Sequence, residues 1–127
     1  MLGSAYDSGM DTILIVEDDD DLRDSILELL QLRGFNVVAA ADGQQALDEL
    51  RAGLTPCLII LDLMLPVVSG WEFRNQQLSD PRLSEIPTVI VSGINNLEIE
   101  SRRLQATAFV SKPINFDLLF KTVEQNC

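Results

Sequence analysis

The stretch 57–70, CLIILDLMLPVVSG, decides the fold of this chain. Its apolar run ends on a carboxylate, Asp62, and is followed by Pro66 and by Gly70, where a new amphipathic segment begins. An unbroken run of β-favouring residues is typical of a strand buried on both faces, as in parallel sheets covered by helices. Because burying a carboxylate is costly, we expect Asp62 at the end of that strand, in the crevice where open α/β sheets bind ligands.

Strand-type runs alternate with helical patterns over residues 12–127. Strands are predicted at 12–16, 36–40, 57–62, 88–91 and 108–110. Helices are predicted from 22 to Gly34, from the cap Asp42 to Gly53, over 71–78, over 97–106, and from the cap Asn115 onward. Strict alternation predicts a parallel sheet with right-handed crossovers and helices on both faces. The expected fold is therefore a doubly wound (βα)5 domain with strand order 2-1-3-4-5.

Length and composition predict one globular domain of 127 residues, 46% of them hydrophobic. Residues 1–11 lack periodicity and are interpreted as a flexible leader or an expression remnant, leaving 12–127 as the domain. No apolar run is long enough to cross a bilayer and no signal-peptide pattern opens the chain, so we expect a cytoplasmic location. Cys57 and Cys127 make no disulfide framework and are interpreted as reduced, structural residues.

The charge of the chain limits the classes of molecule that it can bind directly. A net charge of −11 argues against nucleic acid or an anionic membrane as a direct partner, because both favour clusters of Lys and Arg. The chain has no histidine, which excludes Ser-His and Cys-His nucleophilic pairs, most zinc sites and a phosphohistidine. If phosphate chemistry is involved, another molecule must supply the phosphoryl group.

Four of the five predicted strands end on groups that handle phosphate or metal: Glu17 with Asp18, Asp62, Ser92 and Lys112. The carboxyl ends of parallel strands share one edge, so these residues should converge. Three clustered carboxylates cannot all stay ionised unaided, and a hard cation such as Mg²⁺ relieves their repulsion. With Asp62 as nucleophile, and Mg²⁺, Lys112 and Ser92 around the phosphoryl oxygens, the set suits formation of an aspartyl phosphate.

The acidic run at 17–21 invites two other interpretations. Residues 19–21 are expected to be carboxylates at the start of a helix, where the dipole favours them, so only Glu17 and Asp18 are ligand candidates. A calcium-binding EF-hand loop is excluded, because the glycine at its sixth position is missing.

Four motifs together resemble the response-regulator receiver domain of two-component signalling: ILIVEDD at 13–19, DLMLPVVSG at 62–70, VSG at 91–93 and FVSKP at 109–113. The resemblance implies a CheY-like, flavodoxin-like three-layer sandwich. It implies that Asp62 is the phosphoacceptor and that Glu17, Asp18, Asp62 and the backbone carbonyl of Met64 hold Mg²⁺. It also implies that Lys112 pairs with the phosphoryl group and that the peptide bond between Lys112 and the following proline is cis.

Receiver domains switch by moving a Ser or Thr toward the phosphoryl group while an aromatic side chain rotates inward, and Ser92 and Phe109 occupy these positions. Ser92 is alternatively a turn residue, and Phe109 alternatively plain core. Phe109 replaces the commoner tyrosine and lacks its hydroxyl. The stretch from Ser92 to Lys112 is a residue or two shorter than usual, which leaves the length and pose of the helix between them open. Trp71 is interpreted as a packing residue.

The resemblance implies a phosphorylation-controlled signalling switch. It implies no enzymatic activity other than the domain's own Mg²⁺-dependent phosphorylation and autodephosphorylation. The phosphoryl group would come from a histidine kinase or histidine phosphotransfer protein. Output would be protein–protein contact through the fourth helix, fifth strand and last helix, with phosphorylation-linked homodimerisation as one form. Two alternatives remain: a phosphate relay or sink without output, and an Mg²⁺-dependent phosphohydrolase. The second is disfavoured because Met64 stands where such hydrolases carry an acid.

Overall fold

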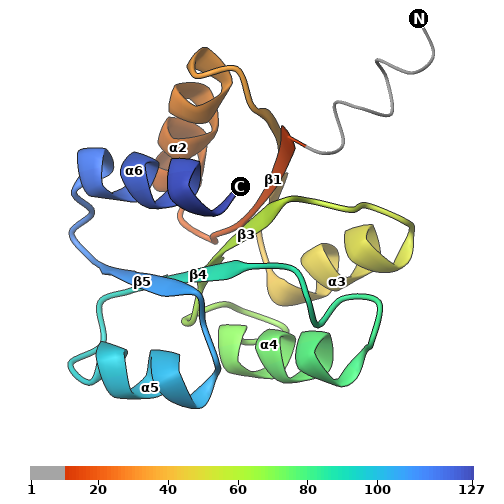
Figure 1. The fold of residues 1–127 in the computed structure, drawn as a ribbon. Coiled ribbons are helices and arrows are strands. Elements are labelled where there is room, and N and C mark those ends of the chain that lie inside the picture. The colour runs from red at the N-terminus through yellow and green to blue at the C-terminus, as the bar shows by residue number, and fades with distance from the viewer. Residues whose placement is uncertain (1–10) are drawn as a thin grey trace, which may run out of the picture.

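A parallel sheet of five strands forms the centre of the computed structural model, which describes residues 11–127 (Figure 1). The strand order is β2-β1-β3-β4-β5. The strands are β1 (Thr12–Val16), β2 (Asn36–Ala40), β3 (Leu58–Asp62), β4 (Thr88–Ser92) and β5 (Ala108–Ser111). Residues 1–10 of the predicted leader lie outside the described residues, so the domain boundary at residue 12 stays a prediction.

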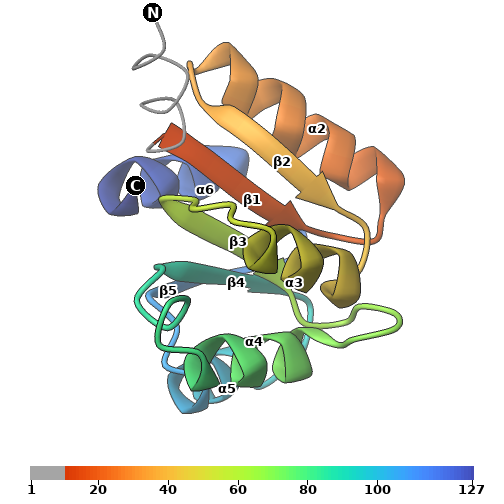
Figure 2. The same ribbon diagram turned by 90° about the vertical axis from the view of Figure 1, so that its right-hand side faces the viewer.

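Five helices cover the sheet in the part of the chain that the structure describes: α2 (Asp20–Leu32), α3 (Gly43–Arg51), α4 (Gly70–Ser79), α5 (Leu97–Arg103) and α6 (Phe116–Asn126). Helices α2 and α6 lie on one face of the sheet, and α3, α4 and α5 lie on the other (Figures 1 and 2). The predicted three-layer, doubly wound (βα)5 architecture is confirmed, including its strand order. None of these helices has the length and apolar composition that a membrane span requires.

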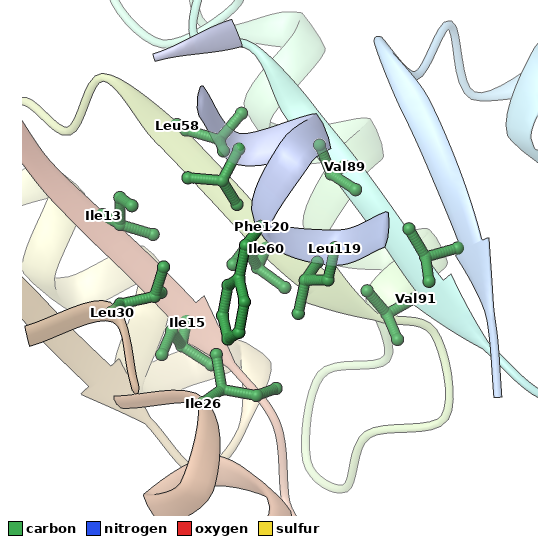
Figure 3. Packing of buried hydrophobic residues seen from close by; sticks show 12 residues of the cluster. Ile13, Ile15, Ile26, Leu30, Leu58, Ile60, Val89, Val91, Leu119 and Phe120 are labelled. Carbon is green, nitrogen blue, oxygen red and sulfur yellow. The ribbon is translucent and has the colours of Figure 1, made fainter. Parts of the chain in front are cut away.

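Alternate strand residues serve the two faces of the sheet, because successive side chains of a strand point to opposite sides. Ile13, Ile15 and Ile60 pack with α2 and α6, where Ile26 and Phe120 are buried (Figure 3). The intervening residues, such as Leu14, Ile59 and Leu61, pack against α3 and α4. The three inner strands are buried along their whole length, which explains their unbroken apolar sequence.

Most helix limits agree with the sequence signals. The predicted caps Asp42 and Asn115 are confirmed, since the side chain of each accepts a backbone N–H three residues on. Helix α2 begins two residues before the predicted start, because Asp19 caps it by accepting the N–H of Leu22. Helix α5 ends at Arg103 and not at residue 106 as predicted, and its end is followed by Gln105 with a positive φ of 55°.

Helix α4 holds a buried charge that the sequence did not predict. Arg74 is 3% exposed, and its guanidinium donates to four acceptors. These are the carbonyls of Leu104 at 2.9 Å and Gln105 at 2.8 Å, Gln77 Oε1 at 2.8 Å and Thr88 Oγ1 at 3.0 Å. Two of these acceptors follow the last residue of α5, so Arg74 ties the C-terminal end of α5 to α4.

Trp71 makes a second link between the same helices. Its side chain packs against the cluster of Leu63, Ile90 and Leu97, as expected of a packing residue. The indole Nε1–H also donates to Glu100 Oε1 at 2.9 Å, which lowers the pKa of that carboxyl. Helix α5 is therefore linked to α4 at its middle, through Glu100, and just after its C-terminal end, through the carbonyls of Leu104 and Gln105.

The interpretation of the cysteines as reduced residues is wrong in this structure, because Cys57 and Cys127 form a disulfide. Their Cα atoms lie 5.0 Å apart although 70 residues separate them in the chain. Helix α6 runs back toward the edge where β3 starts, and this brings the last residue beside Cys57. Two single cysteines in one chain carry no spacing signal that predicts such proximity.

Candidate functional site

The candidate site lies at the edge of the sheet where the parallel strands end. Asp62 is the last residue of β3, and Glu17 directly follows β1. In the register of these strands Val16 is paired with Leu61, so Glu17 and Asp62 are neighbours. The end of β4 at Ser92 and the residue after β5, Lys112, belong to the same edge. The predicted convergence of the four strand ends is thus confirmed.

Three carboxylates gather at this edge. Glu17, Asp18 and Asp62 each offer an oxygen atom, and these oxygens all lie within 4.8 Å of one another. Asp18 is exposed, whereas Glu17 is 2% and Asp62 is 4% exposed. Oxygen-only ligands with one open, solvent-facing side suit Mg²⁺, which keeps several of its water molecules. The donor set therefore fits the predicted metal.

The electrostatics of Glu17 reflect this crowding. Burial raises the pKa of the Glu17 carboxyl, and the charge of Asp62 raises it further. Lys112 and the N–H of Asp19, which donates to Glu17 Oε2 at 3.1 Å, act in the opposite direction. The raised pKa means that Glu17 binds a proton more readily than an exposed glutamate, because burial disfavours its charged form.

Lys112 faces the two buried carboxylates. Its Nζ lies 2.9 Å from Glu17 Oε1 and 3.2 Å from Asp62 Oδ2. Burial alone would lower the pKa of Lys112, but the hydrogen bond to Glu17 and the charge of Asp62 outweigh burial, so the pKa is raised and the amine stays protonated. The peptide bond between Lys112 and Pro113 is cis, as predicted.

Backbone contacts orient Asp62. The N–H of Met64 donates to Asp62 Oδ1 at 3.2 Å, which leaves Oδ2 toward Lys112. A Cβ atom at Gly70 would overlap the Asp62 carbonyl oxygen, so only glycine fits this position. Gly70 N–H in turn donates to the Leu63 carbonyl at 2.9 Å, which closes the loop after β3. The role of the Met64 carbonyl as a metal ligand stays a prediction.

The two predicted switch residues differ in their surroundings. Ser92 is fully buried, and its Oγ accepts the N–H of Ile94 at 3.4 Å, so it also shapes the turn after β4. Phe109 lies in β5 and is 42% exposed, which excludes the alternative of a plain core residue. A half-exposed aromatic side chain at an edge strand has room to change its rotamer. The switching roles of both residues stay predictions.

Two features beside the site were not predicted from the sequence: the contact of Arg23 with Glu17 and a groove. Arg23 Nη1 donates to the backbone carbonyl of Glu17 at 2.9 Å, and its place one turn into α2 could have indicated this contact. A groove of about 460 Å³ lies between the start of α2 and the segment from β5 to α6. Its lining includes Leu22, Lys112 and Phe116. An exposed apolar groove next to Lys112 cannot be predicted from periodicity, because its lining comes from two distant segments.

Comparisons with known proteins agree with this geometry. The family model described as "Response regulator receiver domain" matches residues 13–124. Response regulator Rre1 of Synechocystis is 33% identical over 111 residues, which cover 85% of this chain and 48% of that protein. The transcriptional regulatory protein CpxR of Escherichia coli is 46% identical over 106 residues, covering 84% of this chain and 44% of that protein.

Among solved structures, the chemotaxis response regulator CheY4 of Vibrio cholerae superposes with a TM-score of 0.84 at 28% identity, covering 93% of this chain and 99% of that one. The chain spans about half or less of the length of the first curated relatives that it matches. The match over nearly all described residues and the shared fold agree with the four motifs at the edge of the sheet. The chain belongs to the response-regulator receiver-domain family of two-component signalling.

Proposed function

We propose that this receiver domain is a phosphorylation-controlled switch that accepts a phosphoryl group on Asp62. The observation that carries the proposal is a 4% exposed aspartate that ends the central strand, with two carboxylates within 4.8 Å and Lys112 Nζ at 3.2 Å. Such a set combines a nucleophile, a cation-binding cluster and a fixed positive charge. Phosphoryl transfer depends mainly on positioning and charge neutralisation, which these groups supply.

The transfer step uses a carboxylate oxygen of Asp62 as the nucleophile. It attacks the phosphorus of a phosphohistidine, the P–N bond breaks, and the imidazole nitrogen keeps the electron pair and takes a proton. Glu17, Asp18 and Asp62 would hold Mg²⁺, which would neutralise negative charge at the phosphoryl oxygens. The Lys112 ammonium then leaves its contact with Asp62 for a phosphoryl oxygen. Hydrolysis by water returns the carboxylate and releases inorganic phosphate.

We infer the phosphoryl donor and the output by analogy with the family. A histidine kinase or histidine phosphotransfer protein would supply the phosphoryl group, because the chain has no histidine of its own. Ser92 would move toward the phosphoryl group and Phe109 would rotate inward, which changes the surface of α5, β5 and α6 for a downstream protein or a second copy. We place this exchange in the cytoplasm, where such donors present their histidines.

The test is incubation with Mg²⁺ and acetyl phosphate, followed by intact-protein mass spectrometry. Wild type should gain one phosphoryl group, Asp62→Asn should gain none, and Asp48→Asn, the same change on the exposed face of α3, should behave as wild type. Absence of the gain in wild type would contradict the proposal.

Two alternatives are separated by kinetics. A relay or sink would return the phosphoryl group rapidly to a histidine donor, whereas a switch holds it for minutes. A phosphohydrolase would turn over exogenous phosphoesters, and the side chain of Met64, 62% exposed beside the site, offers no acid for that reaction.

A further inference from the structure

The loop between β3 and α4 runs from Leu63 to Ser69 and borders the proposed metal site. Leu63 is fully buried at its start. The next residue, Met64, donates its N–H to Asp62 Oδ1 at 3.2 Å. The path of this loop therefore determines both the orientation of the Asp62 carboxylate and the position of the Met64 backbone. A contact that holds the loop also holds the site.

Such a contact exists at Gly43, the first residue of α3. A Cβ atom at this position would overlap the carbonyl oxygen of Val68 and would lie 2.9 Å from the Val68 Cβ. The loop backbone thus occupies the space that a side chain at position 43 would take. Two loop side chains, Leu65 and Val68, also pack against the core cluster that includes Ala46 and Leu47 of α3.

Helix α3 is fixed in place by its N-terminal cap and by its buried side chains. The Asp42 side chain caps it by accepting the N–H of Gln45 at 2.8 Å, and the same helix buries Ala46, Leu47 and Leu50 in the core. A larger residue at position 43 would therefore move the loop and leave the helix in place.

The loop does not adopt its shape by its own preference. Val67 has a φ of +66°, in the left-handed region, although a β-branched residue is strained there. Its side chain is 79% exposed, so burial of that side chain does not offset the strain. A strained conformation persists only when the surrounding structure imposes it. The neighbouring contact between Val68 and Gly43 is such a constraint.

We propose that Gly43 is a positioning residue for the phosphoacceptor loop. It admits the Val68 backbone against α3, and the loop in this position presents Met64 and Asp62 to the metal. The inference rests on the proposed function, since it names a contact that positions the loop beside the proposed metal site. Gly43 touches neither the metal nor the phosphoryl group and acts through Val68.

The test compares Gly43→Ala with Gln44→Ala, the adjacent position in the same helix turn. Mg²⁺ dissociation constants are measured by isothermal titration calorimetry at a temperature where circular dichroism shows each variant folded. We expect Gly43→Ala to raise the dissociation constant roughly tenfold or more, the effect of disturbing residues that orient metal ligands. Gln44→Ala should stay within about twofold of wild type, because alanine keeps the Cβ already present and removes only a side chain that hydrogen-bonds to Asp48 of the same helix. Wild-type affinity in folded Gly43→Ala would overturn the inference.

A second variant covers the case in which Gly43→Ala does not fold. Val68→Gly removes the side chain that packs the loop against the core cluster of α3 and adds no atom to α3, so it should loosen the loop and also weaken Mg²⁺ binding. Val67→Gly, one residue away, relieves the strain but keeps the contact, so it should raise the melting temperature and leave the Mg²⁺ dissociation constant unchanged. Equal Mg²⁺ affinity of Val68→Gly and wild type would overturn the inference.

The failure of this inference differs from the failure of the proposed function. If wild type takes a phosphoryl group from acetyl phosphate and the contact variants bind Mg²⁺ as wild type does, only the positioning role of Gly43 is wrong. If wild type takes no phosphoryl group, the proposed function itself is wrong.

Discussion

Replacing the proposed phosphoacceptor should stabilise the metal-free domain. In Asp62→Asn the amide oxygen can keep the N–H of Met64, and Lys112 keeps its ion pair with Glu17 at 2.9 Å, so no buried group loses its last partner. The change removes the charge of a 4% exposed carboxylate from a cluster of three. The Asp62 carboxylate therefore lowers the stability of the metal-free domain, although the proposed phosphoryl transfer requires it.

The magnitude follows from the distances. Carboxylate oxygens within 4.8 Å repel by about 3.5 kcal/mol or more per pair at an effective dielectric constant of about 20. Asp62 has two such neighbours, and its attraction to Lys112 at 3.2 Å is about 5 kcal/mol on the same scale. Screening at the exposed Asp18 reduces the net repulsion, and the desolvation of a buried charge adds to it. We therefore expect Asp62→Asn to be more stable by about 2 kcal/mol.

The assay is urea unfolding followed by circular dichroism, with EDTA and then with Mg²⁺. In EDTA the midpoint of Asp62→Asn should rise by about 1 M, for a urea slope of about 2 kcal/mol/M. Mg²⁺ at about 100 times its dissociation constant should stabilise wild type by about 2.7 kcal/mol and the variant much less. Glu124→Gln, an exposed carboxylate on α6, serves as control and should change neither midpoint. A loss of stability in metal-free Asp62→Asn would refute the reasoning.

Three further predictions concern the contacts away from the site. Arg74→Met should lower the free energy of unfolding by about 3 kcal/mol, because several buried acceptors lose a charged donor, whereas the exposed Arg102→Met should change it by less than about 0.5 kcal/mol; equal urea midpoints would contradict this. The pKa of Glu100 is lowered by its hydrogen bond from Trp71, so stability from this contact is present above the ordinary value of 4.5 and is lost as pH falls through the folded-state pKa. The emission of Trp71, the single tryptophan, should report a transition below pH 4.5 that Glu100→Gln abolishes, and a midpoint above 4.5 would exclude the contact. Cys127→Ser opens a cross-link between residues 70 apart and should lower stability by about 4 kcal/mol in the chain-entropy model; a wild-type midpoint that does not respond to reductant would argue against the disulfide.

The strands, and the edge of the sheet where the site lies, could be predicted because short local sequence patterns indicate both. Each inner strand is a short apolar run, and a polar residue such as Glu17 or Asp62 marks where the run reaches solvent. Parallel topology then places these marks on one edge without any knowledge of distances. The predicted proximity of Lys112 to Asp62, 50 residues apart, is confirmed at 3.2 Å for this reason.

Features that depend on packing between helices could not be predicted. Arg74 has the sequence properties of a surface residue, and its burial depends on carbonyls that Leu104 and Gln105 present after α5 ends. The end of α5 was misplaced because residues 104–106 have no strong helix breaker. The disulfide of Cys127 depends on the direction of the last helix, which no local pattern gives.

Gly43 illustrates the same limit within the site. From the sequence it is a residue beside a helix cap, and glycine there is ordinary. Only the position of Val68, 25 residues further on, shows that a side chain at Gly43 would displace the loop after Asp62. Residues that position a site from a neighbouring element are recognised when the backbone of both elements is known.

The most direct test of the account is the location and metal dependence of the phosphoryl group. Wild-type protein treated with acetyl phosphate should be digested and its modified peptide sequenced by mass spectrometry, in parallel samples with Mg²⁺ and with EDTA. We expect one phosphoryl group, on Asp62, formed with Mg²⁺ and not with EDTA. A phosphoryl group on another residue, or equal modification in EDTA, would contradict the proposed Mg²⁺-dependent phosphorylation of Asp62.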